Sequence, residues 1–250
     1  MSGILRSSRG SRLRALTPAR VDLGRTGVSQ RTADLLDFQR AHAQARDAVH
    51  ARLDAETLAA AMKTIVDGDV LCLRSAATNR AKYLQCPDLG RRLAKESREF
   101  LEHVPNEYCD LSIVIADGLS ALAVERHAAA LLKELLPRLE GWRLTPLCVV
   151  EQGRVAIGDE IGAALGAQLC VVLIGERPGL SSPDSLGAYL TWEPHPGRTD
   201  AERNCISNIR GEGLSYSEAA RQLALSLAEA RRRRLTGTGL KLESHSLESD

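Results

Sequence analysis

Aromatic residues are scarce in this sequence, where only 3% of 250 residues are Phe, Trp or Tyr. So few aromatic rings leave little surface on which nucleic-acid bases could stack. The formal net charge of +1 gives no general attraction for phosphate or for an anionic membrane. No apolar run approaches the roughly 20 residues of a membrane span, and no signal-peptide core follows Met1. We therefore expect neither nucleic acid nor a membrane as a partner.

The cysteines form no metal-binding pattern. The sequence contains no CxxC pair and no Cys/His cluster with zinc-ligand spacing, although it has six cysteines. Two of them, Cys148 and Cys170, lie inside apolar runs, where a reduced cysteine packs as a small hydrophobic side chain. We expect no metal site, and reduced thiols in a cytosolic compartment.

Common catalytic and nucleotide-binding motifs are also missing. There is no GxxxxGK[ST] phosphate loop, no complete GxGxxG after a strand and no GxSxG nucleophile turn. These absences weaken the standard nucleotide-binding and hydrolase interpretations. The 44% hydrophobic and 26% charged residues are ordinary for a folded globular chain with an ample core.

The N-terminal part of the chain divides into two predicted segments. Residues 1–28 carry several arginines and no acidic residue before Asp22, which indicates a flexible basic leader. Such a leader is either a disordered tail or a targeting segment. Residues 29–107 are predicted to be helical, with helices over 32–53, 54–66 and 88–104. Thr32 is the expected N-cap of the first helix.

From Tyr108 onward, strands and helices alternate. The apolar runs LSIVIADG, LTPLCVVEQ and LCVVLIGE are separated by predicted helices over 119–136 and 158–166, and a last helix follows over 215–232. This alternation predicts an α/β domain over 108–235, with a parallel, Rossmann-like sheet and crossover helices. The final segment, 236–250, is expected to be a frayed tail.

Two polar loops follow predicted strands, at the sheet edge where α/β proteins bind ligands. Asp117-Gly118-Leu119-Ser120 opens a helix, so it either faces a ligand or only caps that helix. The second loop, 175–179, holds Glu176 and Arg177 between two glycines. These two side chains either recognise a ligand or form an internal ion pair.

Six blocks of sequence carry a resemblance to a known family. In chain order they are RTADLLDFQRAHAQARDAV, NRAKYLQCPDLGRRL, DLSIVIADGLSALAV, GRVAIGDEIG, VVLIGERPGLSSPDSLGAYL and RNCISNIRGEGLSYSEAA. From about Gln30 to about Lys241 the chain resembles the small, or light, subunit of ethanolamine ammonia-lyase, a bacterial enzyme that depends on adenosylcobalamin. The resemblance implies a radical elimination that converts ethanolamine to acetaldehyde and ammonia. It also implies a hetero-oligomer with a large subunit that holds the substrate site and the catalytic residues, so no catalytic residue is expected here.

The same resemblance implies three cofactor-binding residues and no metal ligand. Val155 would contact the corrin, Glu176 would accept hydrogen bonds from polar cofactor groups, and Cys205 would pack at the cofactor rim. From the residues alone, a strand-end valine, a loop ion pair and a buried thiol are the alternatives. The sequence lacks the DxHxxG motif with which other cobalamin proteins supply a histidine to cobalt. That absence fits a base-on cofactor that keeps its own dimethylbenzimidazole.

The resemblance implies a location in the bacterial cytoplasm, or in a bacterial microcompartment with the leader as the address. Two other classes of function remain open at this point. One is a stand-alone α/β binding module or enzyme with a nucleotide-like ligand at the Asp117 and Glu176 loops. The other is a ligand-free interaction protein that uses the leader and Arg231–Arg234.

Overall fold

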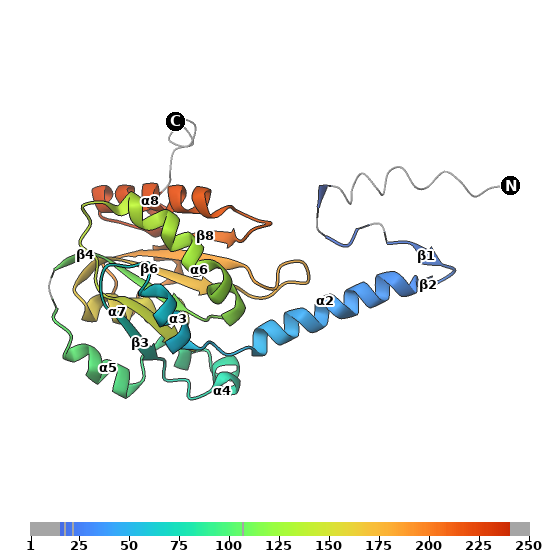
Figure 1. Ribbon diagram of the computed structural model, residues 1–250, viewed down its shortest axis with the longest axis horizontal. Helices are drawn as coiled ribbons and strands as arrows, with labels where there is room; N and C mark the ends of the chain where they lie inside the picture. The colour runs from blue at the N-terminus through green and yellow to red at the C-terminus, as the bar shows by residue number, and fades with distance from the viewer. Residues whose placement is uncertain (1–15, 18, 22, 107, 241–250) are drawn as a thin grey trace.

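The computed structural model describes residues 16, 17, 19–21, 23–106 and 108–240. Its body is a six-stranded sheet with helices on both faces, and helix α2 (Thr32–His50) extends away from that body (Figure 1). Most of the predicted leader lies outside the described residues. Its last residues belong to a hairpin of β1 (Arg25–Thr26) and β2 (Ser29–Gln30).

The sheet is mixed, with the strand order β3-β5-β4-β6-β7-β8. The strands are β3 (Val70–Arg74), β4 (Cys109–Ala116), β5 (Leu147–Glu151), β6 (Ala167–Gly175), β7 (Leu186–Trp192) and β8 (Arg203–Ile209). β3, β5, β4 and β6 run parallel, whereas β7 and β8 pair antiparallel. The prediction of parallel strands is therefore confirmed for β4, β5 and β6. β3 is a fourth parallel strand that was not predicted, and the antiparallel pairing of β7 makes the sheet mixed. The direction reverses because the segment between Gly175 and Leu186 contains no crossover helix.

The region 29–107 is not wholly helical, because β3 is an edge strand of the sheet and pairs with β5. Its helices are α2, α3 (Ala55–Met62), α4 (Arg80–Gln85) and α5 (Lys95–Glu102), with a short 3₁₀ turn, η1 (Leu89–Arg91). The single helix predicted over 88–104 is wrong. It is interrupted where Ala94 donates a backbone hydrogen bond to Arg74 of β3, at 2.9 Å. Thr32 is also not the N-cap of α2; Arg31 is, without a side-chain cap.

Successive residues of a strand project to opposite faces of the sheet and contribute to two separate apolar layers, one on each face. Leu111, Ile113 and Ile115 of β4 belong to the layer under α3, α6 (Ala121–Leu135) and α8 (Tyr216–Arg233). Val114 and Ala116 belong to the opposite layer, which includes α7 (Ile157–Ala164) and α5. Figure 1 shows α6 and α8 on one side of the sheet and α7 and α5 on the other. The helices predicted over 119–136, 158–166 and 215–232 are confirmed to within about two residues at each end.

The predicted tail is ordered at its start. The backbone N–H of Trp192 donates to Thr236 Oγ1 at 2.9 Å, and Leu240 is only 5% exposed. The expectation of a frayed segment is thus wrong for residues 236–240, and residues 241–250 lie outside the described part. Within the described ranges, no helix combines the length and the apolar character that crossing a membrane requires.

Candidate functional site

One face of the sheet stays open at its antiparallel end. Tyr189 of β7 pairs in register with Cys205 of β8, so both side chains project from the same face. Tyr189 packs at the edge of the layer under α7, whereas Cys205 and Ser207 are exposed. We call the surface formed by Glu176, Gly187, Tyr189 and Cys205 the open face.

Glu176 directly follows β6 and turns its carboxylate over β7. A Cβ atom added to Gly187 would lie 2.9 Å from Glu176 Oε1, so the carboxylate needs the space that this glycine leaves. Ser185 Oγ and the Asn208 N–H both donate hydrogen bonds to Oε2, the latter at 3.3 Å. Oε1 accepts no hydrogen bond from any residue that the structure describes. Glu176 is thus held in place with one acceptor oxygen free.

The internal ion pair, one of the two alternatives for this loop, is not formed between the described residues. The salt bridges between described residues include neither Glu176 nor Arg177, and Arg177 is exposed. The Glu176 carboxylate is instead fixed by a hydroxyl and a backbone N–H, which are neutral donors. Its negative charge therefore stays available to a ligand.

Cys205 is a neutral thiol beside this carboxylate. Desolvation raises the pKa of Cys205, Tyr189 hydrogen bonds to the thiol and opposes that rise, and the Glu176 charge adds to it. The alternative of a buried thiol is wrong, since Cys205 is exposed. By contrast, Cys148 and Cys170 are buried as predicted, and burial raises the pKa of Cys148 to about 12.

Val155 lies on the same side of the sheet, in the turn between β5 and α7. It is half-buried and packs against the apolar layer to whose edge Tyr189 also belongs. Its carbonyl accepts a hydrogen bond from the Gly158 N–H at 3.1 Å, which fixes the start of α7. The structure therefore brings Glu176 and Cys205 together around Tyr189 and places Val155 at the neighbouring helix start.

The Asp117 loop is a structural turn. Ser120 caps α6 by accepting a hydrogen bond from the Ala123 N–H. Asp117 is fully buried, and its Oδ1 accepts from the Gly153 N–H at 3.0 Å, while Arg80 Nη1 lies 3.3 Å from Oδ2. Burial raises the pKa of Asp117 to about 6, although the Arg80 charge opposes that rise. This carboxylate connects the end of β4 to the turn after β5 and to the first residue of α4, so it does not face an open ligand site.

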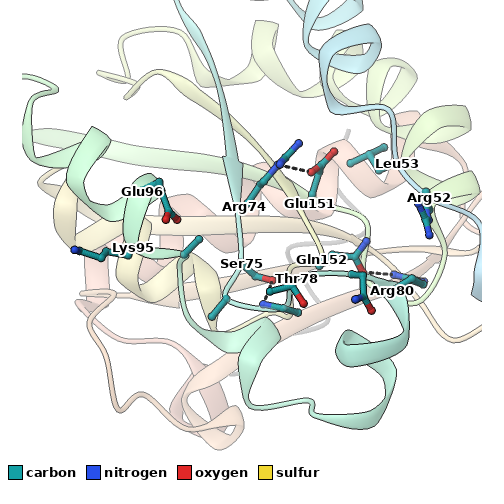
Figure 2. Close-up of a pocket in the computed structure, with 14 residues that line it drawn as sticks. Arg52, Leu53, Arg74, Ser75, Thr78, Arg80, Lys95, Glu96, Glu151 and Gln152 are labelled. Atoms are coloured by element: carbon teal, nitrogen blue, oxygen red, sulfur yellow. Dashed lines mark hydrogen bonds and ion pairs between the residues drawn. The ribbon is translucent and has the colours of Figure 1, made fainter.

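A separate cavity of about 600 Å³ opens at the carboxyl ends of β3 and β5 (Figure 2). Its lining includes Arg52, Arg74, Arg80, Glu151 and Gln152, but none of the three predicted cofactor residues. Sequence reasoning did not find this cavity. Neither the cavity nor the open face contains a metal-type cluster, since no group of three His, Cys, Asp or Glu side chains among the described residues could hold an ion.

Comparison with known proteins adds the family. The sequence model of the ethanolamine ammonia-lyase light-chain family matches residues 8–241. The chain belongs to the ethanolamine ammonia-lyase light-chain family. A relative from Xanthomonas campestris pv. campestris strain B100, named ethanolamine ammonia-lyase small subunit, is 58% identical over 239 residues, which cover 94% of this chain and 88% of the relative.

Two further light-chain relatives carry the same name. The one from Azotobacter vinelandii strain DJ is 58% identical over 238 residues, covering 93% of this chain and 87% of the relative. The one from Pseudomonas fluorescens strain Pf-5 is 55% identical over 245 residues, covering 95% of this chain and 89% of the relative. The resemblance inferred from the sequence blocks is thus confirmed over nearly the whole light chain.

Proposed function

We propose that this chain is the small subunit of an ethanolamine ammonia-lyase and holds adenosylcobalamin against the large subunit. The observation that carries this proposal is the open face, where a fixed carboxylate with a free oxygen lies beside an exposed thiol. In a family whose members are named as small subunits, such a surface without a helix over it is a natural place for a large cofactor and a second chain to dock.

The residues fit the groups that a corrinoid presents. Glu176 Oε1 can accept hydrogen bonds from amide or hydroxyl groups, while Val155 and the neutral Cys205 thiol offer apolar contact. Bound there, the cofactor supplies the radical chemistry that eliminates ammonia from ethanolamine and yields acetaldehyde. This chain would position the cofactor, exclude water and complete the interface with the large subunit, and it contributes no catalytic residue.

The composition of the open face supports a base-on cofactor, since none of its residues is a histidine that could replace the dimethylbenzimidazole on cobalt. The large subunit then supplies the substrate site and the catalytic side chains. We place the complex in the bacterial cytoplasm, with a microcompartment as its location if residues 1–28 act as an address.

Thiol labelling tests this docking, because the chain carries an internal control. In the isolated chain, a maleimide at pH 8.5 should label both exposed cysteines, Cys72 of β3 and Cys205. After addition of the large subunit and adenosylcobalamin, labelling of Cys205 should fall at least tenfold, whereas labelling of Cys72 should change little. Mass spectrometry of the two peptides measures both rates. Unchanged labelling of Cys205 in a complex that has formed would contradict the proposed site.

A further inference from the structure

The cavity at the ends of β3 and β5 is built around a buried arginine. Arg80 is only 4% exposed, and its Nε donates to the Val49 carbonyl at 2.7 Å. Nη1 donates to the Gly118 carbonyl at 2.8 Å and lies 3.3 Å from Asp117 Oδ2. The remaining nitrogen, Nη2, is also buried and has no hydrogen-bond partner among the described residues.

An unpaired guanidinium nitrogen is unfavourable inside a protein, because it has lost water without gaining a hydrogen-bond acceptor. The Tyr83 ring, 4.8 Å from Arg80 Cζ, attracts the charge of the guanidinium but supplies no oxygen acceptor. The Asp117 carboxylate does not remedy this, since it faces Nη1 and is shared with the Gly153 N–H. Arg80 belongs to the cavity lining. An acceptor that entered the cavity could therefore complete its hydrogen bonds.

The rest of the lining favours a negatively charged occupant. Four cationic side chains and two carboxylates line the cavity; the cations are Arg52, Arg74, Arg80 and Lys95, and the carboxylates are Glu96 and Glu151. Lys95 is paired with Glu99, outside the lining, at 3.5 Å. Glu151 is already paired with Arg74 at 2.8 Å. Arg52 is exposed and forms no ion pair with any residue that the structure describes.

Figure 2 shows how these groups are arranged. The Arg74–Glu151 pair and the Arg80–Gln152 pair lie apart from each other around the cavity. Arg52 lies on the same side as Arg80, and the hydroxyl-bearing Ser75 and Thr78 also line the cavity. The cavity lies at the carboxyl ends of two parallel strands, where open α/β sheets bind their ligands. Its volume, about 600 Å³, is that of a small-molecule site.

We propose that this cavity binds an oxyanion, the phosphate or carboxylate group of a ligand, with Arg80 Nη2 and Arg52 as its donors. This site is distinct from the open face and does not depend on the cofactor. Arg80 also donates a hydrogen bond to the Val49 carbonyl of α2. The bound anion would therefore stabilise the position of the end of α2 relative to the sheet.

Inorganic phosphate is the probe for the full chain, titrated by calorimetry, with chloride at equal ionic strength as the reference. Phosphate should bind and raise the melting temperature beyond the chloride value. Arg52→Ala should weaken phosphate binding about fivefold or more, and Arg80→Lys should weaken it further. Lys133→Ala removes an exposed cation from α6 and should leave phosphate binding unchanged.

Two results would overturn the proposal. One is equal stabilisation by chloride and phosphate, and the other is equal phosphate binding by Arg52→Ala and Lys133→Ala, which would indicate an adventitious ion only. Repeating the titration on the complex with the large subunit identifies the source of the oxyanion. Retained binding indicates a small molecule, whereas blocked binding, together with weaker assembly of Arg52→Ala, indicates a carboxylate of the large subunit.

Discussion

Glu176→Ala should weaken the binding of adenosylcobalamin to the two-subunit complex by about tenfold to a hundredfold. A hydrogen bond to a charged group contributes roughly 1.5–3 kcal/mol, and every 1.4 kcal/mol is about a factor of ten in affinity. Among the described residues, Ser185 Oγ and the Asn208 N–H hold the Glu176 carboxylate through Oε2, and Oε1 accepts no hydrogen bond. Removal of this carboxylate should therefore lower the affinity for the cofactor much more than it lowers the stability of the fold.

The matched control for this variant is Glu134→Ala. Glu134 is a partly exposed carboxylate of α6, on the opposite side of the sheet, and its side chain is 44% exposed. Visible absorbance of the corrinoid across an equilibrium titration measures both affinities, and circular dichroism verifies the fold. Equal affinities for the two variants would remove Glu176 from the cofactor site.

Asp159→Asn should destabilise the protein by about 3–5 kcal/mol, because it removes the buried carboxylate partner of Arg203 and leaves only the exposed Asp200, 3.4 Å from Arg203 Nε. Arg203, the first residue of β8, donates to both carboxylate oxygens of Asp159 on α7, at 2.7 and 2.6 Å. Both side chains are at most 3% exposed. Cys205 lies two residues further along β8. The Asp159–Arg203 pair therefore also fixes the position of the strand that carries the proposed cofactor contact.

Asp88→Asn provides the comparison, because it breaks an exposed ion pair of the same chemistry. Asp88 and Arg92 lie 3.3 Å apart, with both side chains more than 60% exposed. We expect a change within about 0.5 kcal/mol for this variant. Urea unfolding of the two variants measures the difference. A similar small loss for both would show that the Asp159–Arg203 pair does not hold β8 to α7.

Local patterns predicted those elements whose burial follows a simple period. β4, β5 and β6 are continuous apolar runs since both of their faces are covered, and α6 and α8 have clear apolar stripes. β3 was missed because it is a short edge strand of mixed exposure, VLCLR, inside a region of helical periodicity. The antiparallel direction of β7 depends on what joins it to β6, which strand composition does not indicate.

The candidate site illustrates a different limit. Val155, Glu176 and Cys205 were named through the family resemblance, since a lone valine or cysteine has no local signal of ligand binding. Tyr189 and Gly187 carried no such signal either, because small and large residues do not alternate in LGAYL.

Arg80 had no signal at all in the sequence. Its acidic neighbour, Asp117, lies 37 residues further along the chain, and only the fold brings the two together. Arg231 of the C-terminal arginine run likewise proved to pair with Asp110, at 2.9 Å. That pair weakens the hypothesis of a freely available basic patch.

Size-exclusion chromatography with visible absorbance tests the central claim most directly. The chain is run alone with adenosylcobalamin, and again after co-expression with the large subunit encoded in the same genome. The proposed function predicts that corrinoid colour elutes with protein only in the two-subunit peak. Colour that elutes with the isolated chain, or a folded large subunit that forms neither a complex nor a coloured peak, would contradict it and favour a stand-alone binding module.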